Sequence, residues 1–289
     1  MKTNLFIAGF AKCGTTSLYQ MLLTSDQICG GTSKEPAYFS TLKGRTATNS
    51  LADWSVSGRY DRGLDWYQRI FPNGESAYQL DASTIYAFDP ATPALIHQYN
   101  PAARFIFVVR EPYSRIESHY FQEVKTGLDL PPFAEFIASD HPRLRFYKEA
   151  TRYKRTLLRF QPYFADDSVL VLSLPMLKEL DLLQEKLSNF LGSEITLAAA
   201  RAHTVSNKRK AARLPLLKKA LIAVERSRLA HQSPRWLQEA GSRLFRGVDR
   251  VLLREVQDTP QIAPQIKARI RAEFEEDLSY LKQNHGVGI

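Results

Sequence analysis

Short apolar runs alternate with amphipathic stretches along the first two thirds of the chain. Runs rich in β-branched and aromatic residues cover residues 5–9, 104–109 and 169–172, and a shorter strand-like segment covers 79–81. The runs are almost continuously apolar, which is typical of strands buried on both faces of a parallel sheet. Helical periodicity is found over residues 15–24, 113–125, 148–161 and 177–191. The pattern therefore predicts an α/β fold with a central, mostly parallel sheet flanked by helices.

The C-terminal third carries apolar stripes at helical spacing, punctuated by prolines. The last stripe comprises Ile266, Ile270, Phe274, Leu278 and Leu281, and two earlier stripes lie within 217–252. These stripes predict a helical C-terminal extension. We expect a single domain over residues 1–289, with an α/β core at 1–200 and a basic loop and helical extension at 201–289.

Residues 41–78 lack clear periodicity but contain several aromatic residues. These are Trp54, Tyr60, Trp66 and Tyr67. The segment is either an irregular insertion that covers a site or a surface loop pinned by its aromatic side chains, and the sequence leaves both interpretations open.

The net charge of +9 is concentrated in one segment. Residues 207–254 contain thirteen Lys or Arg and three acidic residues, so this segment carries +10 and the rest of the chain −1. In the simplest interpretation its apolar stripes pack on the core, and in a second one they rest on an anionic membrane. We expect no nucleic-acid partner, and the sequence leaves the oligomeric state open.

The two cysteines, Cys13 and Cys29, and the six histidines show no spacing typical of metal ligands, so we expect no metal site. Two thiols in a chain of this length suggest a reducing compartment. The first ten residues resemble a buried strand rather than a secretory leader, and no run approaches the roughly 18 apolar residues that a membrane span needs. We therefore expect a cytoplasmic location, with peripheral membrane contact through 207–254 as the alternative.

A glycine-bracketed loop follows the first apolar run. Gly9 and Gly14 enclose Lys12, and three hydroxyl residues at 15–17 begin the next helical stretch. Loop N–H groups and a helix N-terminus both attract anions, and the lysine adds a positive charge, so the loop predicts a phosphate site. A Walker A loop has its lysine directly after the second glycine, where this chain has Thr15. The site is therefore not of the Walker A form.

A second candidate for anion binding follows the apolar run at 104–109. Arg110 comes directly after the run, Pro112 suits the first turn of a helix, and Ser118 lies about two turns into that helix. A guanidinium fork and a hydroxyl placed in this way can hold one phosphate from two sides.

Taken together, the two motifs resemble those of sulfotransferases that use 3′-phosphoadenosine 5′-phosphosulfate (PAPS). In this chain they read F-x-x-G-x-x-K-x-G-T-T-S-L and R-x-P-x-x-R-x-x-S-H-Y. The resemblance implies a P-loop-like three-layer fold and a donor whose 3′-phosphate is bound by Arg110 and Ser118. It also implies that the donor's 5′-phosphosulfate is bound by Lys12, Cys13, Gly14, Thr15, Thr16 and Ser17. The implied product is adenosine 3′,5′-bisphosphate, and no metal is required.

Two further segments are similar to those of carbohydrate sulfotransferases. Residues 33–39 look like their K-E-P-x-[YF]-F segment, whose glutamate, here Glu35, is the proposed catalytic base in heparan-modifying members. Residues 203–210 look like the late basic loop that closes on the nucleotide. This second likeness makes Lys208 and Arg209 donor-binding candidates.

The resemblance implies sulfuryl transfer to a hydroxyl of a sugar, a glycolipid or another alcohol. We expect Lys12 to stabilise charge on the leaving oxygen and Glu35 to accept the proton of that hydroxyl. Ala37 and Ala82 stand where heparan-modifying members often carry His and Lys, which weakens the case for a heparan-like acceptor. Two alternatives stay open: a P-loop-type nucleotide-dependent kinase, for which Lys12 is misplaced, and a non-catalytic module that binds nucleotide or polyanion through 207–254.

Overall fold

The computed structural model describes residues 2–43, 57–72, 76–125, 128–198, 210–212, 253–255 and 262–289. Its helices are α1 (Thr15–Leu22), α2 (Leu64–Gln68), α3 (Thr92–Tyr99), α4 (Pro112–Lys125), α5 (Phe133–Ala138), α6 (Pro142–Glu149), α7 (Tyr153–Phe160), α8 (Leu180–Leu191), α12 (Pro264–Ala272) and α13 (Glu275–His285). Short 3₁₀ turns cover Tyr60–Arg62, Thr84–Ala87, Asp166–Ser168 and Pro175–Lys178. No helix within the described ranges is both long enough and apolar enough to cross a bilayer.

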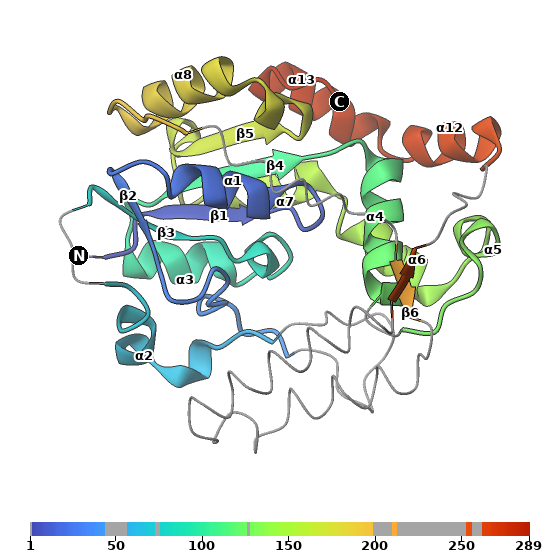
Figure 1. The fold of residues 1–289 in the computed structure, drawn as a ribbon, viewed down its shortest axis with the longest axis horizontal. Coiled ribbons are helices and arrows are strands. Elements are labelled where there is room, and N and C mark those ends of the chain that lie inside the picture. Colours follow the sequence, from blue (N-terminus) through green and yellow to red (C-terminus); the bar gives the residue numbers. More distant parts are fainter. Residues whose placement is uncertain are drawn as a thin grey trace.

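A five-stranded parallel sheet forms the centre of the fold (Figure 1). Its strands are β1 (Leu5–Gly9), β2 (Ile28–Gly30), β3 (Tyr78–Asp81), β4 (Arg104–Val109) and β5 (Val169–Ser173), in the order β2-β3-β1-β4-β5. Strand β1 is completely buried and β4 nearly so, as their continuously apolar sequences predict. Helices flank the sheet, so the predicted α/β architecture is confirmed.

The predicted strands at 5–9, 79–81, 104–109 and 169–172 correspond to β1, β3, β4 and β5, within one residue at each end. Strand β2 was not predicted, because three residues at the edge of a sheet carry no detectable period. Within the insertion at 41–78, the described residues form α2 and one 3₁₀ turn. Trp54 and the stripes at 217–252 lie outside the described residues.

The prediction of one helix over 148–161 is wrong. Helix α6 ends at Glu149, and α7 begins at Tyr153. The carbonyl of Tyr147 accepts hydrogen bonds from Arg115 Nη1 at 3.1 Å and from the hydroxyl of Thr151 at 2.6 Å. These side chains occupy the acceptor that a continuing helix would use for its next backbone N–H, and the chain turns there.

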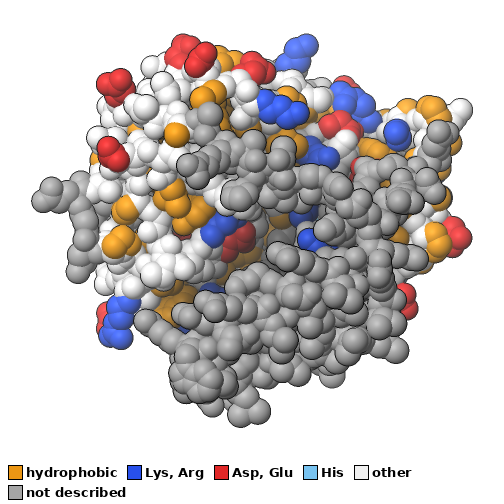
Figure 2. Space-filling view, in the orientation of Figure 1, with side chains coloured by type: hydrophobic (Ala, Val, Ile, Leu, Met, Phe, Trp, Pro, Cys, Tyr) orange, Lys and Arg blue, Asp and Glu red, His pale blue; other side chains and the backbone are white. Residues whose placement is uncertain are grey.

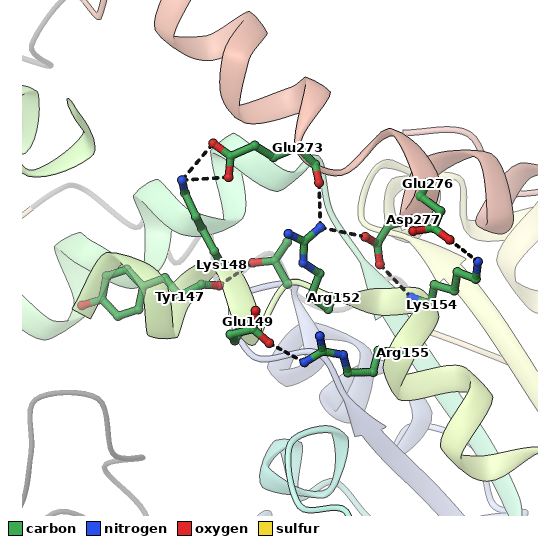
Figure 3. Close-up of polar contacts among 10 residues, drawn as sticks. Tyr147, Lys148, Glu149, Arg152, Lys154, Arg155, Glu273, Glu276 and Asp277 are labelled. Atoms are coloured by element: carbon green, nitrogen blue, oxygen red, sulfur yellow. Dashed lines mark hydrogen bonds and ion pairs between the residues drawn. The ribbon is translucent and has the colours of Figure 1, made fainter. Parts of the chain in front are cut away.

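The C-terminal stripe is divided between two helices. Helix α12 packs against α4, and α13 packs against α7. Just before α7, Arg152 Nη1 donates to the carbonyl of Glu273 at 2.6 Å (Figure 3). Lys148, near the end of α6, pairs with the Glu273 carboxylate at 2.8 Å. The C-terminal helices are therefore held to the core by charged contacts as well as by apolar packing.

Asp277 supplies the N-terminal cap of α7 from a distant part of the chain. Its Oδ1 accepts the N–H of Lys154 at 2.9 Å, and Oδ2 lies 3.4 Å from Arg152 Nη1 (Figure 3). The residue at the cap position of α7, Arg152, makes no side-chain cap of its own. Burial raises the pKa of Asp277, against the hydrogen bond from the Lys154 N–H and the charge of Arg152. The first turn of α7 thus depends on a carboxylate of α13.

Replacing Asp277 by Ala should lower the free energy of unfolding by about 1–3 kcal/mol, because the partly buried N–H of Lys154 loses its acceptor. Glu276 is the matched control, since it is exposed and pairs with the Lys154 side chain at the surface. Glu276→Ala should change the free energy by less than about 0.5 kcal/mol. Chemical denaturation measures both, and equal losses in the two variants would contradict the capping role.

Candidate active site

The loop between β1 and α1 presents backbone N–H groups at the carboxyl edge of the sheet. Its φ angles are positive at Lys12 (71°) and at Gly14 (90°). A Cβ on Gly14 would lie 2.5 Å from Leu174 Cδ1, so the turn requires a glycine there. The N–H groups of residues 15–17 begin α1 and have no acceptor within the helix, and no acidic residue lies in this first turn. Strand, loop and helix start thus have the arrangement that is typical of an anion site.

Lys12 lies in an environment of positive charge. Its Nζ donates to Gln122 Oε1 of α4 at 3.3 Å. Burial lowers the pKa of Lys12 to about 8, assisted by the nearby charges of Lys125, Arg110 and Arg115. Of the groups that act on Lys12 in the described part of the chain, the thiol of Cys13 alone opposes this shift. The ammonium group therefore lacks a neutralising carboxylate, which favours the binding of an anion.

The two predicted anion sites are in direct contact. Arg110 follows β4, and its Nη1 donates to the carbonyl of Lys12 at 3.3 Å. Helix α4 begins at Pro112, as predicted, and Ser118 is half-buried on it. Helical spacing places Ser118 on the same face of α4 as Gln122, the partner of Lys12. The structure thus brings the loop, Arg110 and the Ser118 face of α4 together.

Tyr153, which connects the two sites, could not be predicted from the sequence. Its hydroxyl donates to the carbonyl of Arg110 at 2.6 Å and accepts the Arg110 N–H at 3.3 Å. The same oxygen lies 4.0 Å from Cys13 Sγ, and the ring packs edge-on against Phe10 with centroids 4.6 Å apart. A tyrosine at the start of a helix does not by itself predict a contact with a distant segment. Only the tertiary structure shows that Tyr153 contacts Arg110 and Cys13.

Cys13 belongs to the loop but faces the core. Its side chain is fully buried, and burial raises the pKa of its thiol. Its N–H donates to the carbonyl of Phe10 at 3.2 Å within the loop. The N–H of Cys13 is therefore already hydrogen-bonded within the loop, whereas the N–H groups of residues 15–17 have no acceptor within the helix.

Glu35 is held near the same edge of the sheet by contacts with both of its oxygens. Its Oε1 pairs with Lys34 Nζ at 2.8 Å, and its Oε2 accepts from Thr84 Oγ1 at 3.2 Å. The side chain of Glu35 remains 38% exposed, so a substrate can reach it. The carboxylate is therefore both oriented and accessible.

The segment around Glu35 is attached to the end of β3. The N–H of Ala82 donates to the carbonyl of Lys34 at 3.1 Å, and the N–H of Ala37 donates to the Ser83 hydroxyl at 2.8 Å. Asp81 fixes Ser83 in turn, accepting from its hydroxyl at 2.6 Å and from Tyr67 at 2.9 Å. Burial raises the pKa of Asp81 to about 6, although several donors oppose this shift. Asp81 thus has a structural role that supports Glu35.

Lys208 and Arg209 lie outside the described residues. The adjoining strand β6 (Lys210–Ala212) pairs with β7 (Leu253–Glu255), and β6 contacts α4, which carries Ser118. Across the described ranges, no group of three or more His, Cys, Asp or Glu is arranged to hold a metal ion. His119 is buried and stacks on Tyr147, with ring centroids 4.3 Å apart.

Charged side chains gather around a hollow near the middle of the face shown in Figure 2, with positive groups on more than one side of it and acidic groups beside them. The strand ends that carry the phosphate loop and Arg110 are adjacent, because β1 pairs with β4. Parallel α/β sheets commonly bind ligands at this edge. The arrangement can therefore hold an anionic ligand and expose it to a carboxylate base.

Comparisons with known proteins agree with this geometry. No family model matches the chain. It is 27% identical over 128 residues to heparan sulfate glucosamine 3-O-sulfotransferase 6 of Mus musculus, covering 44% of this chain and 32% of that protein. It is 31% identical over 75 residues to heparan sulfate glucosamine 3-O-sulfotransferase 3B1 of Homo sapiens, covering 26% and 19%. The matched part thus spans a third or less of these curated relatives.

A solved sulfotransferase from Alicyclobacillus acidocaldarius has the same fold. The TM-score is 0.60 at 21% identity, and the match covers 86% of this chain and 93% of that one. The predicted fold is therefore confirmed by structure, and the predicted resemblance to sulfotransferases by sequence.

Tyr153→Phe should weaken binding of adenosine 3′,5′-bisphosphate, the product that the resemblance implies, because Arg110 loses both bonds to the hydroxyl. We expect a loss of about tenfold or more and a drop of about 1–3 kcal/mol in the free energy of unfolding. Tyr280→Phe is the control, since its hydroxyl accepts only an exposed contact from Gln161 at 3.4 Å among the described residues. Isothermal titration and denaturation measure the two effects, and unchanged affinity in Tyr153→Phe would contradict the positioning role.

Proposed function

We propose that this chain, which has the sulfotransferase fold and sequence relatives among the heparan sulfate 3-O-sulfotransferases, transfers a sulfuryl group from PAPS to a hydroxyl acceptor. The observation that carries the proposal is the contact of Arg110 Nη1 with the carbonyl of Lys12 at 3.3 Å. It brings two anion sites from different segments to one edge of the sheet. A nucleotide with anionic groups at both its 3′ and 5′ positions requires two such sites.

The donor is bound by charge and by backbone N–H groups. The free N–H groups of residues 15–17 and the Lys12 ammonium bind the 5′-phosphosulfate, in keeping with the turn at Gly14. Arg110 and Ser118 bind the 3′-phosphate, as the resemblance implies. Lys208 and Arg209 are proposed to close on the nucleotide from the basic loop.

The reaction is a single in-line displacement at sulfur. The acceptor oxygen forms a bond to sulfur while the bond from sulfur to the bridging phosphate oxygen breaks, and that oxygen keeps the electron pair. Lys12 stabilises the charge that develops there, and Glu35 takes the proton of the acceptor hydroxyl. Contacts of Glu35 with Lys34 and Thr84 orient its carboxylate. Positioning and electrostatics supply most of the rate, as in phosphoryl transfer.

The acceptor is proposed to be a sugar hydroxyl on a glycan or glycolipid, with other alcohols as the wider class. The K-E-P-A-Y-F segment supports this choice, because it resembles the corresponding segment of carbohydrate sulfotransferases. Ala37 and Ala82 depart from the heparan-modifying pattern, so the acceptor is not proposed to be heparan. The two free cysteines support a cytoplasmic location.

Adenosine 3′,5′-bisphosphate should raise the melting temperature of the protein, and ATP should raise it far less, because ATP has no 3′-phosphate for Arg110. Arg110→Ala should remove most of the shift, whereas Arg145→Gln, at an exposed pair with Asp140, should leave it unchanged. Equal shifts with both nucleotides would overturn the assignment of the donor.

The affinity for adenosine 3′,5′-bisphosphate, measured by isothermal titration, should depend on pH in a defined direction. Because the pKa of Lys12 is about 8 in the free protein, its charged form is lost as the pH rises through 8. Affinity for the bisphosphate should therefore fall by up to about tenfold per pH unit above 8. In Lys12→Arg the guanidinium stays charged, and the affinity should be flat over this range.

Glu35→Gln should reduce kcat about 10²- to 10⁴-fold and leave the bisphosphate-induced melting shift unchanged, because proton removal is lost while donor binding is kept. Glu276→Gln, far out on the surface of α13, is the control and should have wild-type kcat. The assay follows the transfer of labelled sulfate from PAPS to a panel of sugar and phenol acceptors. A wild-type rate for Glu35→Gln would exclude it as the base.

A further inference from the structure

A cavity of about 280 Å³ lies beside the phosphate loop. Phe10 and Ala11 of the loop form one wall, and Thr84 forms part of another. Among the described residues, the charged lining comes from α4 and from the α6–α7 region: Arg115, Glu149, Arg155 and Arg159. These three arginines and one glutamate give the described lining an excess of positive charge.

Arg115 is the most deeply buried of these arginines, with 1% of its surface exposed. Its Nη1 donates to Tyr147 and Thr151, both neutral acceptors, at 3.1 and 2.8 Å. Its Nε is buried and has no hydrogen-bond partner among the described residues. A buried guanidinium with an unused donor is costly unless a ligand completes it. Arg115 also acts on the buried thiol of Cys13, and its side chain lines the cavity, so an anion bound there could use the donor that the protein leaves unpaired.

Arg159 is a second arginine that lines the cavity. It donates to the carbonyl of Phe88 at 3.2 Å, and no carboxylate of the described residues lies within ion-pair distance of it. Burial lowers the pKa of Arg159, and the charge of Arg155 acts in the same direction, against the more distant Asp89 and Glu149. Arg155 is more exposed and forms an ion pair with Glu149 (Figure 3). The charge of Arg159 is therefore left without a direct counter-ion in this part of the chain.

The cavity shares a wall with the proposed reaction centre. Thr84 lines the cavity and donates to Glu35 Oε2 at 3.2 Å, and Ala11 lies next to Lys12 in the loop. The cavity therefore adjoins both the proposed base and the loop proposed to bind the donor. The volume is sufficient for an oxyanion and a few attached atoms but not for a large ligand.

We propose that this cavity is a subsite for an oxyanion carried by the acceptor, so that the substrate is a hydroxyl compound with a carboxylate, sulfate or phosphate group close to the reacting hydroxyl. Arg115 and Arg159 bind the oxyanion, and Arg155 contributes when it leaves Glu149. The planar guanidinium groups suit the two oxygens of such a group. The inference rests on the proposed function, which it deepens by naming the class of acceptor.

The test uses the full chain with its donor site filled by adenosine 3′,5′-bisphosphate, so that added anions cannot bind there. Methyl β-glucuronide, glucose 6-phosphate and glucose 6-sulfate are titrated at constant ionic strength, with methyl β-glucoside as the uncharged reference. At least one anionic probe should bind at least about tenfold more tightly than the glucoside. The relative affinities identify the oxyanion among the three.

Arg159→Gln should reduce the preference for the anionic probe over the glucoside about tenfold or more. Arg159→Lys should recover part of it, since lysine restores the charge but not the paired N–H donors of the guanidinium. Arg145→Gln, at an exposed pair with Asp140, should keep the wild-type preference. Equal binding of charged and uncharged probes, or an undiminished preference in Arg159→Gln, would overturn the subsite. Failure of the bisphosphate to bind at all would instead refute the proposed function, and the comparison of wild type with Arg159→Gln would then show whether the anionic probes bind in the cavity or at the empty loop.

Discussion

Strands β1 and β4 are paired in parallel at the centre of the sheet, and each ends where an anion-binding motif begins. The pairing fixes the positions of two segments that lie about 100 residues apart, and the bond from Arg110 to the Lys12 carbonyl, separated by 98 positions, joins them. The hydroxyl of Tyr153 then secures Arg110 through its backbone. Glu35 is held separately, at the end of β3, which pairs with the other side of β1.

Electrostatics gives the junction its chemical character. Lys12, Arg110 and Arg115 lie close enough for their charges to influence one another. Burial of the Lys12 ammonium, and secondarily its repulsion by the neighbouring cations, opposes folding, and the lowered pKa of Lys12 records that cost. An incoming dianion removes the repulsion, so the free protein is prepared for its ligand by charges that it does not neutralise itself.

Features confined to one segment could be predicted from the sequence. The apolar run at 104–109, Arg110 and Pro112 lie within nine residues, and their spacing alone predicts strand, loop and helix. The K-E-P segment likewise predicts the place of Glu35. Tyr153 could not be found, because its partners lie 43 and 140 residues away and its helix begins at a break made by side-chain bonds to Tyr147. The cavity could not be predicted for the same reason, because its three arginines come from two separate helices.

The cap that Asp277 provides for α7 has a consequence for the order in which the protein matures. Tyr153 is the first residue of the helix whose Lys154 N–H is satisfied only when α13 has docked. The carboxylate of Asp277 is made 123 positions after the Lys154 N–H that it accepts. The helix start that positions the Tyr153 hydroxyl against Arg110 can therefore be completed only after α13 has been synthesised and packs against α7.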